Sequence, residues 1–123
     1  MSEKPVAERL QVKGERRLAV LNAPRAVDSA MGVPDRRAPL EAADVVALFV
    51  SSRAELNEKL VPALKSLTRD AIFWLAYPKL ASPLAGDLDR DFIAASAPGY
   101  GLTTVAQIAI DADWSALRLK VLR

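Results

Sequence analysis

Runs of apolar residues alternate along the chain with segments that carry apolar side chains at helical spacing. Residues 18–21, 45–50 and 71–77 are continuously apolar, which is typical of strands buried on both faces of a sheet. Between the last two runs, the leucines from Leu56 to Leu67 follow one another at spacings of four, four and three residues. That spacing predicts a helix with one apolar face. The pattern therefore predicts an α/β fold in which helices connect parallel strands.

The long helix has a clear start signal and one internal breaker. Ser52 is followed three residues later by Glu55, which is the capping-box pattern of a helix N-terminus. Pro62 interrupts the helical pattern, because proline lacks an N–H and clashes with the preceding turn. We therefore expect two helical pieces or a kink near Leu60.

The remaining segments give weaker signals. Residues 5–12 and 25–32 predict short helices, and the acidic segment that begins at Asp87 predicts another. Arg36 to Leu40 predicts a weak edge strand, because Pro39 cannot donate to a strand ladder.

The C-terminal residues predict an antiparallel hairpin. Residues 102–110 are largely apolar, and a turn at 111–113 leads into residues 114–122. In that last segment Leu117, Leu119 and Val121 alternate with polar or small residues. One face of the final strand is therefore expected to be buried and the other wet.

Composition bounds the class of protein. A length of 123 residues, 51% apolar residues and 26% charged residues predict one globular domain over residues 1–123. The N-terminal segment lacks the apolar core of a signal peptide, and no apolar run is long enough to cross a membrane. With no Cys, the chain forms no disulfide. We therefore expect a cytoplasmic protein that does not bind membranes.

The residue types that are missing restrict the chemistry. The chain has no His and no Cys, which removes the usual general base and the usual zinc ligands. Asp87, Asp89 and Asp91 do not form a calcium-binding loop, because Phe92 stands where glycine is required and Pro98 where glutamate is required. We assign no catalytic residue and no metal site. We do not expect nucleic-acid binding, because the net charge is only +2 and aromatic residues do not interleave with the basic ones.

A ligand site is predicted at the carboxyl ends of the parallel strands, where open α/β sheets bind ligands. The ligand-binding candidates at these ends are Asn22, Ser52, Tyr77 and Lys79. Ser52 lies at a helix N-terminus, where free N–H groups favour an anion, and Lys79 supplies a positive charge. The competing interpretation is that Ser52 only caps the helix, Asn22 forms a turn and Lys79 is solvated.

The order of elements resembles a shortened Rossmann-like methyltransferase domain, with a mostly parallel sheet, helices on both faces and an antiparallel C-terminal hairpin. That resemblance implies that residues 115–122 insert between 71–77 and 103–110. In the methyltransferases a glycine-rich turn follows the first strand. Here that turn is Asn22-Ala23-Pro24-Arg25. We therefore infer that S-adenosylmethionine binding was lost or was never present, and we assign no cofactor.

The chain also resembles a family of small bacterial proteins known only as a domain of unknown function. The segments that carry this second resemblance are Leu21-Asn22-Ala23-Pro24, Asp44-Val45-Val46, Ser52-Arg53-Ala54-Glu55-Leu56, Trp74, Pro78-Lys79 and Trp114-Ser115-Ala116-Leu117. The resemblance implies a fold and a bacterial origin, and it implies no activity.

Three functions remain open from the sequence. The first is a non-catalytic module that binds an anionic small molecule or has a regulatory role. The second is an enzyme that uses Lys79 or Tyr77 as its acid or base, since a buried lysine with a lowered pKa can act as a base. The third is a protein–protein interaction module, for example a homodimer formed through a helix face or a sheet edge. The missing His and Cys favour the non-catalytic module.

Overall fold

The protein is built around one mixed sheet, which a computed structural model describes for residues 5–68 and 70–122. The five strands follow one another in space as β1-β2-β3-β5-β4. They are β1 (Leu18–Leu21), β2 (Val45–Phe49), β3 (Ile72–Pro78), β4 (Leu102–Ala109) and β5 (Trp114–Val121). The first three strands are parallel, and β5 runs antiparallel to both β3 and β4. The predicted insertion of the last strand between β3 and β4 is confirmed.

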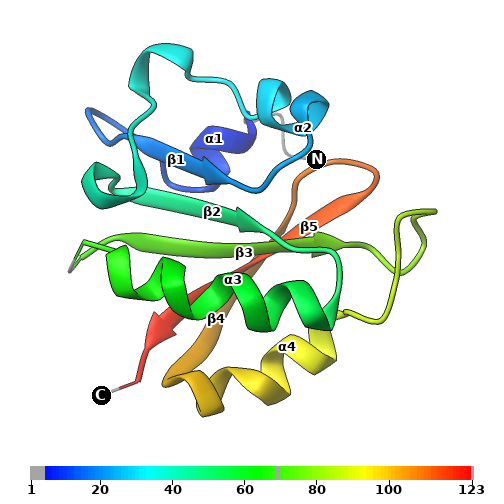
Figure 1. Cartoon of the computed structure of the whole chain (residues 1–123). Helices are drawn as coiled ribbons and strands as arrows, with labels where there is room; N and C mark the ends of the chain where they lie inside the picture. The colour runs from blue at the N-terminus through cyan, green and yellow to red at the C-terminus, as the bar shows by residue number, and fades with distance from the viewer. Residues whose placement is uncertain (1–4, 69, 123) are drawn as a thin grey trace.

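Helices cover both faces of this sheet (Figure 1). They are α1 (Val6–Arg9), α2 (Arg25–Ala30), α3 (Arg53–Ser66) and α4 (Arg90–Ser96). Side chains of α3 and α4 enter one buried cluster with Leu48, Leu75 and Leu117 of the sheet. Side chains of α1 and α2 enter a second cluster on the opposite face. Every residue of β2 is buried, as expected for a strand with helices on both sides.

The two tryptophans both lie in the cluster on the α1 face of the sheet. The indole N–H of Trp74 donates to the Leu10 carbonyl at 2.9 Å. Trp114 packs edge-on against Phe49, with the ring centres 5.1 Å apart. Trp74 thereby connects the centre of the sheet to the end of the short α1 helix.

The edge strand that we predicted at Arg36–Leu40 is wrong. This segment lies between 3₁₀ helices at Pro34–Arg36 and Leu40–Ala42, and only Arg37 forms an isolated bridge, with Leu18 of β1. Pro34 and Pro39 each fix φ near the value of a tight turn, and neither has the backbone N–H that a strand ladder needs. The single bridge at Arg37 therefore does not extend into a strand beside β1.

Of the two alternatives predicted at Pro62, the break into two helical pieces is also wrong, while a kink near Leu60 stays a prediction. The α3 helix runs without interruption from Arg53 to Ser66 and includes Pro62. Pro62 is exposed, while Leu60 and Ala63 on either side of it are buried. Packing on the buried side holds the helix together across the proline.

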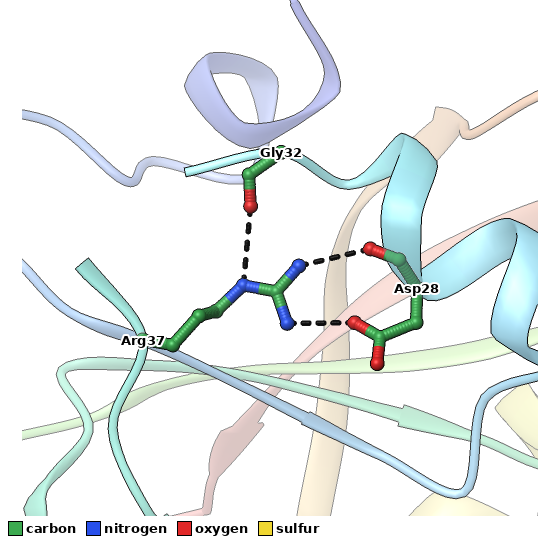
Figure 2. Close-up of polar contacts among 3 residues, drawn as sticks. All are labelled: Asp28, Gly32 and Arg37. Atoms are coloured by element: carbon green, nitrogen blue, oxygen red, sulfur yellow. Dashed lines mark hydrogen bonds and ion pairs between the residues drawn. The ribbon is translucent and has the colours of Figure 1, made fainter. Parts of the chain in front are cut away.

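A single arginine holds the irregular segment that borders β1 (Figure 2). The Arg37 guanidinium donates to the Asp28 carboxylate at 2.6 Å, to the Asp28 carbonyl at 2.9 Å and to the Gly32 carbonyl at 3.1 Å. The backbone next to it is bound to the sheet, because the N–H of Ala38 donates to the Leu18 carbonyl at 3.0 Å. Arg37 therefore fixes the end of α2 and the outer edge of β1 at the same time.

We expect Arg37→Ala to lower the free energy of unfolding by about 1–2 kcal/mol, because bonds from a charged donor to two carbonyls are lost. The ion pair itself adds little, since the Arg37 and Asp28 side chains are 28% and 46% exposed. Urea unfolding measures the change. Arg25→Ala, an exposed residue of α2, is the control and is expected to change stability by less than about 0.5 kcal/mol. Equal effects of the two substitutions would contradict the assigned role.

Candidate functional site

The carboxyl end of β1 is closed by Asn22, which adopts a left-handed backbone conformation with φ of 60°. Asparagine tolerates this region better than most residues, so it can form the sharp turn without a glycine. Its side-chain amide donates to the Phe49 carbonyl at 2.8 Å, and its side chain also hydrogen-bonds Glu55. The residue forms the predicted turn and ties the end of β1 to the end of β2.

The start of α3 is capped by its own residues. The Ser52 hydroxyl accepts the N–H of Glu55 at 3.0 Å. Glu55 reaches back and accepts the N–H of Ser51 at 2.6 Å and the Ser51 hydroxyl at 3.1 Å. Burial raises the pKa of Glu55, but the bonds from Ser51 and Asn22 and the charge of Lys59 outweigh it, so the pKa is lowered overall. Glu55 is therefore a carboxylate at neutral pH. The predicted capping box is confirmed with one difference, which is that the Glu55 carboxylate accepts the backbone N–H of Ser51 and not that of the N-cap residue Ser52.

A second carboxylate reaches this helix end from the loop between β3 and α4. Asp87 accepts the backbone N–H of Arg53 at 2.9 Å, and the Arg53 side chain donates to the Asp87 carbonyl at 2.6 Å. The Arg53 guanidinium also lies 4.1 Å from the ring centre of Phe92 in α4. The helix end at which we predicted an anionic ligand thus already holds an internal carboxylate.

The loop that presents Asp87 approaches the sheet closely. A methyl group at Gly86 would lie 3.3 Å from the Ser51 carbonyl oxygen, a contact that is tight for any larger residue. At its other end, the Lys79 N–H donates to the Asp113 carbonyl at 2.8 Å and the Ser82 hydroxyl donates to the Asp113 carboxylate at 2.8 Å. Residues 79–89 therefore form a loop anchored at both ends across the carboxyl edge of the sheet.

The four predicted ligand-binding residues separate into two groups. Asn22 and Ser52 meet at Glu55. Tyr77 is only 4% exposed and belongs to the cluster on the α3 and α4 face. Lys79 lies at the start of the loop. Within residues 5–68 and 70–122, the recorded hydrogen bonds and ion pairs do not join Tyr77 or Lys79 to Asn22 or Ser52.

Tyr77 has a buried environment that keeps its phenol protonated. Its hydroxyl accepts the side-chain amide of Gln107 at 3.1 Å. Burial raises the pKa of Tyr77, and the nearby carboxylates of Asp89 and Asp91 raise it further, whereas Arg90 and a hydrogen bond with Ser115 lower it. The pKa is raised overall, so Tyr77 can act as a hydrogen-bond partner but does not supply a phenolate at neutral pH.

Sequence reasoning missed the pairing of Arg53 with Asp87. It placed Asp87 at the start of the following helix, but the N-cap of α4 is Asp89, which accepts the N–H of Phe92 at 2.8 Å. The partners Arg53 and Asp87 are 34 residues apart. No local pattern connects them, because the contact exists only once α3 and the 79–89 loop meet at the sheet edge.

Two classes of site find no support in the described structure. No group of three or more acidic side chains suited to a metal ion occurs in the part of the chain that the structure describes. None of the described helices is long and apolar enough to cross a membrane.

Most of the chain matches one protein family. Residues 26–123 match the family described as "Protein of unknown function (DUF3052)". A comparison with curated proteins gives no match.

Solved structures that resemble the chain are methyltransferase-like. A ribosomal protein L11 methylase from Lactobacillus delbrueckii subsp. bulgaricus has a TM-score of 0.58 at 12% identity, over 95% of this chain and 75% of that one. Mitomycin 7-O-methyltransferase MmcR has a TM-score of 0.54 at 11% identity, over 95% of this chain and 53% of that one. LepI in complex with SAH and a substrate analogue has a TM-score of 0.54 at 10% identity, over 94% of this chain and 39% of that one. At such identities the likeness shows a methyltransferase-like fold, and this chain spans only part of each of these proteins.

Proposed function

The chain belongs to the DUF3052 family of proteins of unknown function, and we propose that it is a non-catalytic module that binds a small anionic ligand. The observation that carries this proposal is the set of hydrogen bonds that the side chains at the carboxyl edge of the sheet make within the protein. The side chains of Asn22, Ser52, Glu55 and Asp87 bond one another or the backbone, so they act as structural supports. Catalytic groups, in contrast, need a free proton or a free lone pair directed at a substrate.

The residues after β1 do not fit S-adenosylmethionine. The resemblance implies a glycine-rich turn that lets the backbone approach this cofactor. Here Asn22 directs its amide onto the Phe49 carbonyl, and Pro24, which has no N–H, stands at the N-cap of the six-residue α2 helix. We therefore derive no methyl-transfer step.

The proposed ligand site is the start of α3 together with the loop that covers it. An oxyanion that replaced the Asp87 carboxylate would receive the Arg53 N–H, and Lys79 lies in the loop that would be released. Asp87 is a tethered competitor for such a ligand, so binding and loop release would be coupled. This coupling is the regulatory element of the proposal, and Asn22, Ser52, Tyr77 and Lys79 remain its candidate ligand-binding and supporting residues.

Replacing the competitor tests this proposal. We expect Asp87→Asn to bind inorganic phosphate more tightly than the parent chain, because the amide carries no charge to compete for the Arg53 N–H. Backbone NMR titration measures the affinity and locates the shifts, which should centre on Arg53 and Glu55. Asp91→Asn, an exposed acid in the first turn of α4, is the control for a simple change of net charge.

Two kinds of result would overturn the proposal. The first is a phosphate titration in which neither protein gives saturable shifts at the start of α3, or in which Asp91→Asn gains as much phosphate affinity as Asp87→Asn. The second is turnover of a metabolite or nucleotide by the purified protein that is lost in Lys79→Ala or Asn22→Ala, which would establish the enzyme alternative.

One observation favours a protein partner as a second candidate function. Strand β4 pairs on one side only, with β5, and residues 102–110 contain no charged side chain. Uncharged edge strands pair readily with another chain. A homodimer through this edge would appear as a dimer in sedimentation at micromolar concentration, and a monomer would remove the homodimer version of this candidate.

A further inference from the structure

A groove lies at the end of the sheet opposite to the 79–89 loop. Strands β3 and β5 pair from Pro78–Trp114 to Phe73–Leu119 and then separate. Beyond the last pair, β5 continues with β4 alone. The space between the separating strands, together with the C-terminal end of α3, forms an open groove of about 710 Å³. Figure 1 shows that β5 ends beside the end of α3, on the side away from the arrowheads of β1, β2 and β3. We call this feature the β3–β5 groove.

The β3–β5 groove has apolar walls that reach the surface. Leu64 of α3, Leu67 at the C-cap of that helix and Leu102 of β4 contribute to it. At its rim, Val121 and Leu122 are 62% and 49% exposed. The walls can therefore bury an apolar group of a ligand, and the volume lies within the range of roughly 300–1,000 Å³ that is typical of small-molecule sites.

The charged residues that the structure describes in the groove give it a positive character. Among the described lining residues, Arg118 and Lys120 are two cations and Asp70 is one carboxylate. The Nε of Arg118 is buried and has no hydrogen-bond partner among the described residues. A buried donor without an acceptor is costly and rare in folded proteins. Arg118 itself is half-buried in the groove lining, and its planar guanidinium suits a carboxylate or a phosphate.

We propose that the β3–β5 groove binds an amphipathic oxyanion, with the apolar body against Leu64, Leu67 and Leu102 and the anionic head on Arg118 and Lys120. The alternation along β5 supports this division. Leu117 and Leu119 join the cluster on the α3 face, so Arg118 and Lys120 belong to the opposite face of the same strand. The end of β5 thus presents apolar and cationic groups next to each other. This site is independent of the one proposed at the carboxyl edge, and either can fail without the other.

Simple amphiphiles test the groove. Decanoate and decyl phosphate, both kept below the concentration at which they form micelles, are titrated into the full chain and followed by backbone and arginine side-chain NMR. We expect saturable shifts at Leu64, Leu102 and Leu122 and a shift of the Arg118 Nε–H signal. Decanol lacks the charge and acetate lacks the apolar chain, so both are expected to bind at least about tenfold more weakly. Whichever of decanoate and decyl phosphate binds more tightly identifies the headgroup.

Variants separate the two halves of the site. Arg118→Gln is expected to weaken decanoate binding about tenfold, because the charged donor is lost. Lys120→Gln and Leu122→Ser, at exposed positions, should weaken it severalfold and keep the test valid if Arg118→Gln fails to fold. Arg25→Gln, in α2, which follows β1 at the opposite edge of the sheet, is the charge-matched control. The proposal is overturned if decanol binds as tightly as decanoate, if shifts gather outside the groove, or if Arg25→Gln weakens binding as much as the groove variants.

Discussion

A chain that ends after Ile110 is expected not to fold. Strand β4 pairs only with β5, and β5 also completes the open side of β3. Without residues 111–123, β4 has no strand partner, and the buried side chains of Phe73, Leu75 and Tyr77 lose Leu117 and Leu119 from the cluster they share. The loss of two strand interfaces exceeds the total stability of a small domain, which is about 5–15 kcal/mol.

Circular dichroism and urea unfolding measure this effect. The control is a chain that ends after Val121, which keeps every cross-strand pair of β5 and is expected to unfold cooperatively. A cooperative transition in the chain that ends at Ile110 would show that β1, β2 and β3 fold alone with their helices, and would contradict the central role of β5.

Trp74→Ala is expected to lower the free energy of unfolding by about 3–5 kcal/mol. Trp74 is 2% exposed and is the largest of the fully buried side chains. Its removal opens a cavity between the centre of the sheet and α1, and it leaves the Leu10 carbonyl without its 2.9 Å donor. The cavity and the unpaired carbonyl both contribute to this cost.

Trp74→Phe separates these two contributions. It keeps an aromatic ring and removes the N–H, so a cost of about 1–3 kcal/mol is expected from the unpaired carbonyl and the smaller ring. Trp114→Phe is the comparison at the end of the sheet, where the ring contact with Phe49 can be partly retained. If Trp74→Ala costs less than Trp74→Phe, the cavity has collapsed at no cost and the packing argument is wrong.

The candidate site shows the limit of local signals. Ser52 and Glu55 are three residues apart, and their helix cap was predictable because both partners lie in one turn. Asn22 was predictable as a turn residue for the same reason. The position of Tyr77 was not, because strand alternation says that it faces one side of the sheet but not which helices and strands cover that side.

The sequence-based prediction and the structure differ most clearly in the segment that connects β1 and β2. Arg36 to Leu40 was predicted as a weak edge strand because Pro39 suits an edge, but the segment forms 3₁₀ turns at its two ends and one isolated bridge. Arg37 makes three hydrogen bonds to α2 and the turn after it, which no local pattern predicts. A long side chain has several partners within reach, and only the folded backbone decides which carbonyls it meets.

From the sequence, the five strands of the sheet, the main helices and the residue types missing for common catalytic and zinc sites could all be recognised. These follow from periodicity, from caps within one helical turn and from the residue types that are absent, all of which act over a few neighbouring positions. Tertiary structure alone decided that Asp87 occupies the start of α3, that Arg37 holds the β1 edge, and that β3 and β5 separate to leave a groove beside Arg118. The physical reason is that each of these features joins residues from distant parts of the chain. Their contacts are set by how the helices and strands pack, which no local pattern encodes.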